Sequence, residues 1–346
     1  MSSVSVDDIA DAQARIAGQV LRTPLVPSPS LSEKAGAPVH LKLEHLQITG
    51  SFKLRGASNA VLRLSDQAKA AGVVGVSTGN HGRGLAHAAR KAGVRCIICM
   101  SELVPRNKID GIAAEGAEVR IVGRSQDDAQ VEVDRLVSED GMTMLPPFDH
   151  PDIIAGQGTI GLELTADLPR VDTVVVPVSG GGLIAGVARV VKHARPAARV
   201  VGVSMERGAA MYESRQAGRP VLVEELPTLA DALGGGIGLE NRYTFAMVRD
   251  LVDDLLLVTE AEIAEAIRHA YWWEKQVIEG SGAVGIAALL AGRIGDPGVT
   301  AVVVSGCNID MALHHRIIGG ENVDPGENVD TGDDIAPGDS VAVAKE

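Results

Sequence analysis

The chain has few cysteines and few aromatic residues. Only three of its 346 residues are cysteine, which is too few for a disulfide framework and fits a reducing cytoplasm. Aromatic residues make up 2% of the chain, so the core has to be built from Val, Ile, Leu and Ala. That composition suits buried parallel strands covered by helices. We therefore expect an α/β protein in a cytoplasmic compartment.

Long apolar runs and basic clusters are also missing. No apolar run approaches transmembrane length, and residues 1–16 are typical of a capped helix rather than of a signal peptide. No stripe of Lys and Arg provides the phosphate-neutralising surface that nucleic-acid binding requires. The formal net charge is −13, of which residues 321–346, with eight acidic residues and one lysine, supply −7. We expect neither a membrane nor a nucleic-acid partner.

Strand-like and helix-like segments alternate along the chain, as they do in a parallel doubly wound sheet. The expected strands are residues 73–78, 95–100, 118–123, 173–178, 199–205 and 300–306. The expected helices are residues 84–93, 106–117, 125–137, 158–168, 183–194, 260–276 and 283–292. We predict a large domain from residues 1–71 and 149–318, a small domain from 72–148 inserted in it, and a disordered acidic tail at 319–346. The cleft between two such α/β units is the expected ligand site.

Lys53 lies on an apolar stripe of a helix that we expect to begin near residue 51. Its face continues through Ala57, Ala60 and Leu64. A different face, pointing away from the core, is expected to carry Arg55, Asn59 and Arg63. A buried lysine without a partner lowers its pKa or reacts. The stripe leaves two interpretations open: a lysine that snorkels to solvent, and one that forms a Schiff base.

Three loops follow strands and carry small polar residues. Residues 77–84 (STGNHGRG) and 179–182 (SGGG) offer backbone N–H groups to an anion, and residues 305–308 (SGCN) offer a hydroxyl. The first two are neither a Walker A motif nor a full G-x-G-x-x-G loop, and each alone also fits a tight turn. Together with Lys53 they suit a cofactor with an aldehyde, a phosphate and a ring nitrogen, which is pyridoxal 5′-phosphate.

Five motifs carry a family resemblance that spans residues 20–318. They are TGSFKLRGASNA, STGNHG, VVPVSGGGLIAGVA, IEGSGAVGIAA and VVVSGCNID. In order and spacing they resemble the fold-type-II pyridoxal-phosphate enzymes, the group of threonine and serine dehydratases and serine racemase. More narrowly, STGNHGRGLAHAARKAG, IVGRSQDDAQ, AGQGTIGLEL and GVSMERGAAM are similar to the hydroxyectoine-utilisation dehydratase subgroup.

The resemblance implies two doubly wound α/β domains of the tryptophan-synthase-β-like kind with the cofactor in the cleft between them. It implies that Lys53 forms the Schiff base and removes the substrate α-proton. Around the ring it implies Phe52, Asn80, Glu279 and Ser305, the last facing the pyridine nitrogen. For the phosphate it implies Ser179, Gly180, Gly181, Gly182 and Leu183. For the substrate carboxylate it implies Ser77, Thr78, Gly79, Asn80 and His81.

The function implied is a pyridoxal-phosphate-dependent lyase that eliminates the β-hydroxyl of a hydroxy-amino acid and yields a 2-keto acid and ammonia. The substrate is threonine- or serine-like, or derived from hydroxyectoine, and the enzyme is expected to be a homodimer. A serine-type racemase is the alternative on the same fold. Thr78 stands where the racemase has its second catalytic residue, a serine, and its added methyl group disfavours racemisation.

Two further alternatives come from other classes. A non-catalytic small-ligand-binding α/β protein stays open, whereas a nicotinamide dehydrogenase would need a full dinucleotide loop that the chain lacks. No metal is expected, because Ser204 and Ala210 stand where serine racemase has two acidic metal ligands, and hard cations prefer carboxylates. Glu206 lies close by in sequence.

For the remaining candidate residues, a structural role is weighed against a functional one. Cys96 and Cys99 lie in an apolar strand and are expected to be core thiols rather than a redox or zinc pair. His81 fits a loop residue held by its own hydrogen bonds better than a general base. Arg83 is expected to cap surface carboxylates, and the alternative is that it recognises a second acidic group on the substrate.

Overall fold

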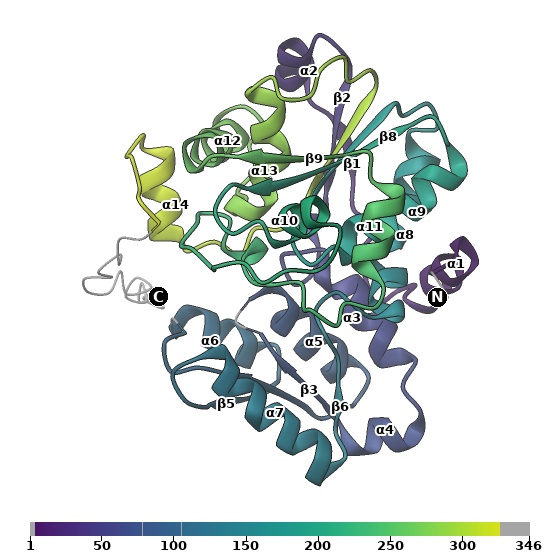
Figure 1. Ribbon diagram of the computed structural model, residues 1–346, viewed down its shortest axis with the longest axis vertical. Coiled ribbons are helices and arrows are strands. Elements are labelled where there is room, and N and C mark those ends of the chain that lie inside the picture. Colours follow the sequence, from purple (N-terminus) through teal and green to yellow (C-terminus); the bar gives the residue numbers. More distant parts are fainter. Residues whose placement is uncertain (1–3, 78, 105, 326–346) are drawn as a thin grey trace, which may run out of the picture.

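The computed structural model describes residues 4–77, 79–104 and 106–325. Two sheets organise this part of the chain, one of six strands in the order β1-β2-β10-β7-β8-β9 and one of four in the order β5-β4-β3-β6. All neighbouring strands are parallel except β1 and β2, which are antiparallel. Figure 1 shows the two sheets in an upper and a lower body. The α/β fold class is therefore confirmed.

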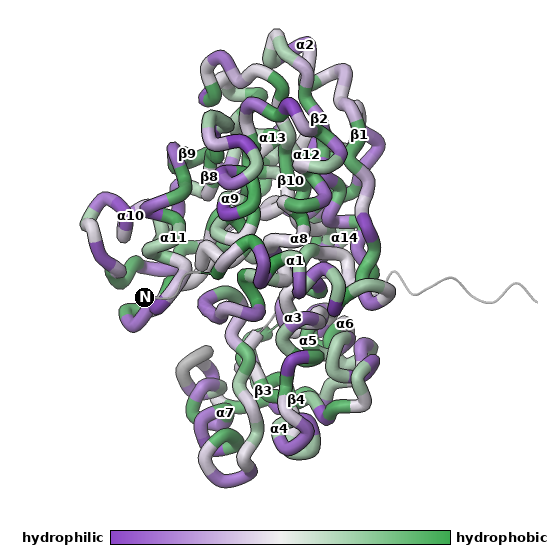
Figure 2. The backbone as a smooth tube through the Cα atoms, turned by 90° about the vertical axis from the view of Figure 1, so that its right-hand side faces the viewer, coloured by the Kyte–Doolittle hydropathy of each residue, from purple (hydrophilic) through white to green (hydrophobic). Residues whose placement is uncertain are grey.

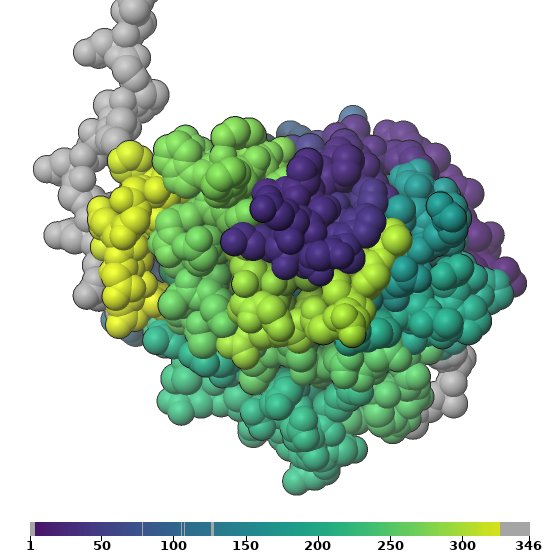
Figure 3. Space-filling model, turned by 90° about the horizontal axis from the view of Figure 1, so that it is seen from above, coloured from purple at the N-terminus to yellow at the C-terminus, as the bar shows by residue number. Residues whose placement is uncertain are grey.

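The six-stranded sheet is built from segments far apart in the sequence. Its strands are β1 (Leu25–Pro27), β2 (Val39–Leu43), β7 (Thr173–Pro177), β8 (Arg199–Met205), β9 (Asp254–Val258) and β10 (Thr300–Val304). Its helices are α1 (Val6–Arg15), α2 (Pro29–Ala35), α8 (Pro151–Asp167), α9 (Gly182–Ala194), α10 (Ala210–Ala217), α11 (Thr244–Leu251), α12 (Glu260–Trp272), α13 (Gly280–Leu290) and α14 (Met311–Ile318), with 3₁₀ turns η1 (Glu44–Leu46) and η2 (Asp231–Leu233). Seen from above, the purple N-terminal segment lies against green and yellow-green segments from late in the chain on one side and teal segments on the other (Figure 3).

The four-stranded sheet uses one continuous stretch of chain. Its strands are β3 (Val73–Val76), β4 (Cys96–Met100), β5 (Glu118–Ile121) and β6 (Thr143–Met144). Its helices are α4 (Asp66–Ala71), α5 (Asn80–Lys91), α6 (Arg106–Ala114) and α7 (Gln126–Asp140). Helix α3 (Lys53–Leu62) packs against both α5 and α8, and so it lies where the two bodies meet (Figure 1). The predicted domain boundaries stay a prediction.

The central strands are apolar along their whole length because both faces of the large sheet are covered. In β10, Val302 and Val304 belong to a core that includes α12 and α13, whereas Ala301 and Val303 belong to a second core that includes α9 and α11. Successive side chains of a strand point to opposite faces, so each face buries alternate residues. The tube in Figure 2 is accordingly green along β8 and β10.

Several expected elements differ in their bounds. Helix α8 begins at Pro151, seven residues before the expected start, because His150 caps it and proline suits the first helical turn. Helix α12 ends at Trp272, and Lys275 just beyond it has a left-handed φ of 60° that no continuing helix allows. Strands β1, β2, β6 and β9 and helices α2, α4, α10, α11 and α14 were not predicted.

Helix α3 contradicts one prediction. Arg55, expected to point away from the core, is completely buried, and Asn59 is buried as well. Arg55 Nε donates to Glu44 at 2.8 Å and Nη1 donates to Glu163 at 2.7 Å, and Lys42 pairs with Glu163 at 2.6 Å. Buried carboxylates brought by η1 and α8 make the inward face suitable for a guanidinium. Arg63 is half-exposed, as expected.

The chain stays packed past residue 319, where a disordered tail was expected. Val323 is buried in the same core as α12 and α13, and Glu321 pairs with Arg316 at 2.7 Å. Residues 326–346 of the expected tail lie outside the described residues. None of the helices in the described ranges combines the length and the apolarity needed to span a bilayer.

Candidate active site

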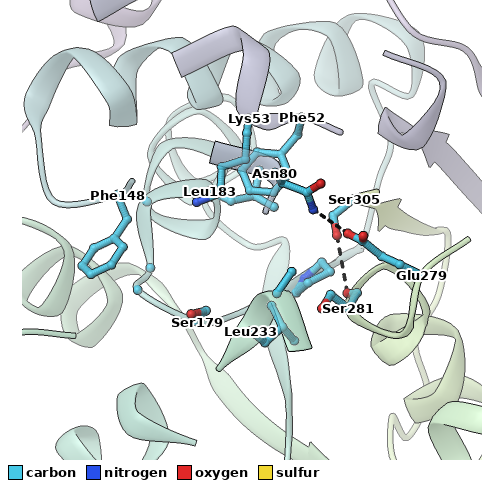
Figure 4. Close-up of a pocket in the computed structure, with 15 residues that line it drawn as sticks. Phe52, Lys53, Asn80, Phe148, Ser179, Leu183, Leu233, Glu279, Ser281 and Ser305 are labelled. Carbon is cyan, nitrogen blue, oxygen red and sulfur yellow. Dashed lines mark hydrogen bonds between the residues drawn. The ribbon is translucent and has the colours of Figure 1, made fainter. Parts of the chain in front are cut away.

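The three loops singled out in the sequence meet in one cavity. Ser77 follows β3, Ser179 follows β7 and Ser305 follows β10, so each lies just past the carboxyl end of a parallel strand. Ligands of open α/β sheets bind at such ends. The cavity is lined by Phe52, Lys53, Asn80, Ser179 to Leu183, Glu279, Ser281 and Ser305 (Figure 4). All of the residues predicted to bind the cofactor line this cavity.

Lys53 begins α3, and its amine reaches into the cavity. Lys53 Nζ donates a hydrogen bond to the carbonyl oxygen of Pro147 at 2.8 Å and lies 5.3 Å from the centre of the Phe52 ring. Burial lowers the pKa of the Lys53 amine to about 8. A larger share of this amine is uncharged near neutral pH than for an ordinary lysine, which is what a nucleophile for an aldehyde requires.

The loop between β7 and α9 forms a glycine cradle at a helix N-terminus. Gly181 has a left-handed φ of 87°. A Cβ atom at Gly180 would lie 2.2 Å from the Phe148 ring, and one at Gly182 would lie 2.9 Å from the Phe148 carbonyl oxygen. Only glycine therefore fits at these positions, and α9 directs its first N–H groups and the positive end of its dipole toward the cavity. The cradle fits a phosphate group.

Ser305 places a neutral hydroxyl on the cavity wall. Its Oγ donates to the carbonyl oxygen of Ser281 at 3.4 Å (Figure 4). Its own carbonyl oxygen accepts from the Phe52 N–H at 3.1 Å. The second bond ties the segment after β10 to the residue before Lys53. With the amine of Lys53 and the glycine cradle in the same cavity, these residues fit pyridoxal 5′-phosphate, which needs an amine, a phosphate site and a partner for its ring nitrogen.

Asn80 and Glu279 form a buried pair that joins the two bodies. Asn80 Nδ2 donates to Glu279 Oε1 at 2.7 Å (Figure 4). Asn80 Oδ1 accepts from Asn308 Nδ2 at 2.5 Å. Burial, followed by the charge of Asp231, raises the pKa of Glu279 to about 7. Asn80 belongs to α5 and Glu279 caps α13, so this pair fixes the small sheet against the large one at the cavity.

The loop expected to hold the substrate carboxylate enters α5. Ser77 Oγ accepts from the Gly82 N–H at 3.0 Å. His81 is buried, and its Nε2 donates to the carbonyl oxygen of Leu145 at 2.9 Å. Burial and the charge of Lys53 lower the pKa of His81 to about 4, so it stays neutral. His81 is therefore held by its own hydrogen bond, whereas Thr78 lies outside the described residues.

The sequence reasoning missed several cavity residues. Pro147 and Phe148 came from a segment interpreted only as a loop, and Ser281, Leu233 and Asn308 were not singled out. The motif around Glu279 contains Ser281, and the one around Ser305 contains Asn308, so the motif context was a signal for both. Nothing local marks Phe148, whose place next to Gly180 arises from tertiary packing.

Two predictions outside the cavity can also be placed. Cys96 and Cys99 are buried in β4, and burial raises the pKa of their thiols to about 12 and about 11, which confirms them as core residues. Ser204 lies in β8 and Ala210 begins α10. Across the described ranges, no group of three or more His, Cys, Asp or Glu side chains is placed to hold a metal ion. The expected absence of a metal stays a prediction.

Comparison with known proteins identifies the class. The model of the family "Pyridoxal-phosphate dependent enzyme" matches residues 16–306. The chain belongs to this family, and the predicted cofactor, pyridoxal phosphate, is confirmed. The resemblance to fold-type-II enzymes is confirmed as well, because solved structures of that group superpose on nearly the whole chain.

Individual relatives are similar over most of their length. A Sinorhizobium fredii protein named "Putative threonine dehydratase" is 59% identical, with 92% of this chain and 97% of the relative covered. The L-threonine ammonia-lyase of Thermotoga maritima is 42% identical, with 91% and 78% covered. The structure of maize serine racemase is 34% identical with a TM-score of 0.86, covering 91% of this chain and 97% of that one. The prediction of a pyridoxal-phosphate-dependent lyase is confirmed at this level.

Proposed function

We propose that the chain is a dehydratase that removes the β-hydroxyl of a small hydroxy-amino acid and releases a 2-keto acid and ammonia. The observation that carries the proposal is the Lys53 amine in one cavity with the Ser179–Leu183 cradle and the hydroxyl of Ser305. Relatives named as threonine dehydratase and threonine ammonia-lyase support the reaction type. Threonine and serine are the first substrates to test, followed by amino acids derived from hydroxyectoine.

Lys53 has two tasks in this reaction. Pyridoxal phosphate, when bound, supplies an aldehyde that captures amines and a conjugated ring that withdraws electron density from the substrate α-carbon. Lys53 Nζ would hold the cofactor covalently and, as a free amine, would take the substrate α-proton. A pKa of about 8 suits both tasks, because a general base is most effective when its pKa is close to the working pH.

Ser305 favours elimination over transamination. A carboxylate at this position would hold a facing ring nitrogen in its protonated form and stabilise a carbanion at the α-carbon for longer. The neutral hydroxyl of Ser305 does not, so prompt loss of a β-leaving group is favoured. Ser77 and the residues from Gly79 to His81, at the N-terminus of α5, orient the substrate through its carboxylate, since backbone N–H groups and the helix dipole attract an anion there.

Borohydride reduction and turnover test the proposal directly. Purified wild-type protein is expected to be yellow, and borohydride is expected to fix the cofactor on Lys53. Lys53→Ala is expected to lose both the covalent attachment and ammonia release from threonine and serine. Lys34→Ala, at an exposed lysine of α2, is the matched control and is expected to keep both.

Different results would support the alternatives. Covalent cofactor and full activity in Lys53→Ala would overturn the assignment of Lys53. A colourless wild-type protein without turnover would favour a non-catalytic ligand-binding protein. Conversion of L-serine to D-serine without ammonia release would favour a racemase, so the assay follows chirality as well as ammonia. The homodimer, tested by sedimentation, and the cytoplasmic location stay predictions.

A further inference from the structure

Arg83 borders the space in which the substrate binds. It is the fourth residue of α5 and lies one helical turn after Asn80. Its half-buried side chain lines a cavity together with Lys53, Ser77 and Gly79. The same cavity therefore holds the amine that meets the α-carbon, the loop that meets the α-carboxylate, and a guanidinium.

The charge of Arg83 has no counterion in the described part of the chain. Its guanidinium forms no hydrogen bond or ion pair with the residues that the structure describes. Arg90 on the same helix, by contrast, pairs with Glu115 at 3.0 Å. The expected capping of surface carboxylates by Arg83 is therefore not observed. A half-buried guanidinium without a partner is unfavourable, and binding an anion from solution would relieve that cost.

The guanidinium of Arg83 packs against Gly111 of α6. A Cβ atom at Gly111 would lie 2.1 Å from Arg83 Nη2 and 2.4 Å from its Cζ, so any larger residue would push the guanidinium away. The position of Arg83 thus depends on a second residue from a different helix.

The other charged side chains that line this cavity are engaged or lie at its rim. Lys108 pairs with Asp231 at 2.6 Å, and Glu279 accepts from Asn80 at 2.7 Å. Glu225 is exposed. Among the described charged side chains that line this cavity, the half-buried guanidinium of Arg83 is therefore the group that can still pair with an anionic ligand.

We propose that Arg83 binds a second carboxylate on the substrate, so that the preferred substrates are hydroxy-dicarboxylic amino acids of the 3-hydroxyaspartate type. This inference rests on the proposed dehydratase function and names its substrate class. The planar guanidinium donates two parallel hydrogen bonds to a carboxylate, a geometry that a neutral amide or a methyl group does not match. A site built around such a donor pair rejects analogues that lack the acceptor.

A pair of substrates that differ in charge tests the subsite. 3-Hydroxyaspartate and 3-hydroxyasparagine have nearly the same shape, but only the first has a side-chain carboxylate. In the wild type, kcat/KM for 3-hydroxyaspartate is expected to exceed that for 3-hydroxyasparagine by ~10- to 100-fold, the range of one charge-assisted hydrogen-bonded contact. Arg83→Met is expected to bring this ratio down to about 1, mainly through KM for the acid, because the contact is made in the ground state as well.

Three further variants separate the subsite from general damage. Arg83→Lys is expected to keep part of the ratio because it retains the charge without the paired donors. Gly111→Ala is expected to lower the ratio while Arg83 itself is still present, which covers the case in which Arg83→Met fails to fold. Arg90→Gln, on the same helix and paired with Glu115, is expected to keep the wild-type ratio.

A binding measurement gives a readout besides turnover. Succinate has two carboxylates and butyrate has one, and neither has an amine. Calorimetry of the wild-type holoenzyme is expected to show tighter binding of succinate, and Arg83→Met is expected to remove that difference. If the wild type releases ammonia from threonine but shows no preference for 3-hydroxyaspartate or succinate, the subsite is wrong and the dehydratase stands. If succinate is preferred but no hydroxy-amino acid is turned over, the subsite stands as an anion site and the dehydratase is wrong.

Discussion

Arg55 and Glu44 form an ion pair with 2.8 Å between Nε and Oε2 in which both side chains are completely buried. Arg55 lies two residues after Lys53 on the same helix, and Glu44 comes from η1. Glu163 joins it from α8, and Lys42 joins from β2 through Glu163. Helix α3, which carries the amine of the site, is therefore anchored in the large body by buried charges as well as by apolar contacts.

Arg55→Met is expected to destabilise the fold by about 3–5 kcal/mol, because it leaves the Glu44 carboxylate buried without its counterion. Urea unfolding followed by circular dichroism measures this change. Arg63→Met on the same helix is the matched control: Arg63 is half-exposed and pairs with Asp152 at 3.2 Å, so its loss is expected to cost less than about 1 kcal/mol. Equal stability losses in the two variants would contradict the role given to the buried pair.

The burial of Arg55 shows where sequence reasoning reaches its limit. The helical stripe of Lys53 was predicted correctly in part: Ala57 and Ala60 are buried. The opposite side of α3 was predicted to face solvent because it carries arginines. Its partners come from 11 and 108 residues away, and helical periodicity contains no information about what packs against a face.

The loops, by contrast, could be predicted. Ser179 to Gly182 and Ser305 each follow a continuously apolar strand, and parallel strands bring their carboxyl ends to one edge of a sheet. The strand pattern therefore implied that these loops meet, although it did not show that the Phe148 ring fills the space that a side chain at Gly180 would need.

The loading of apoenzyme with cofactor is expected to depend on pH through Lys53. Its pKa is lowered to about 8, so the uncharged amine that attacks the aldehyde becomes dominant above pH 8 rather than above the usual lysine value of 10.5. The rate of covalent loading, followed by the visible absorbance at a fixed excess of pyridoxal phosphate, should rise with pH and level off above about 8. A rate that keeps rising up to pH 10 would show that the Lys53 amine is not perturbed.

Gly180→Ala is expected to weaken cofactor binding by roughly 10- to 100-fold, equivalent to about 1.4–2.7 kcal/mol. A methyl group at residue 180 would overlap the Phe148 ring, so the cradle or the ring has to move. The dissociation constant for pyridoxal phosphate measures the effect in titrations of apoenzyme. Gly295→Ala is the control, because a Cβ atom there meets nothing within 4 Å. Unchanged binding in Gly180→Ala would argue against the cradle.

Removal of divalent cations is expected to leave activity unchanged. Ser204 and Ala210 offer no carboxylate at the place where acids would bind a hard cation. Ammonia release is measured before and after treatment with a chelator, and again after addition of magnesium. Activity that collapses with the chelator and returns with magnesium would contradict this prediction and point to Glu206 as the first candidate ligand.

Glu279→Gln is expected to stabilise the apoenzyme in a pH-dependent way. Burial raises the pKa of Glu279 from 4.5 to about 7, so folding disfavours its charged form. Below pH 4.5 the group is protonated in both the folded and unfolded states and carries no penalty. As the pH rises toward 7 the unfolded state ionises first and gains stability. Above pH 7 the penalty is complete, at roughly 3 kcal/mol for a shift of this size.

Glutamine at position 279 keeps the acceptor for Asn80 Nδ2 without the charge. Urea unfolding should therefore show the variant to be more stable than wild type at pH 8.5, with the difference reduced at pH 5; an advantage of equal size at both pH values would show that the charge of Glu279 is not its cause.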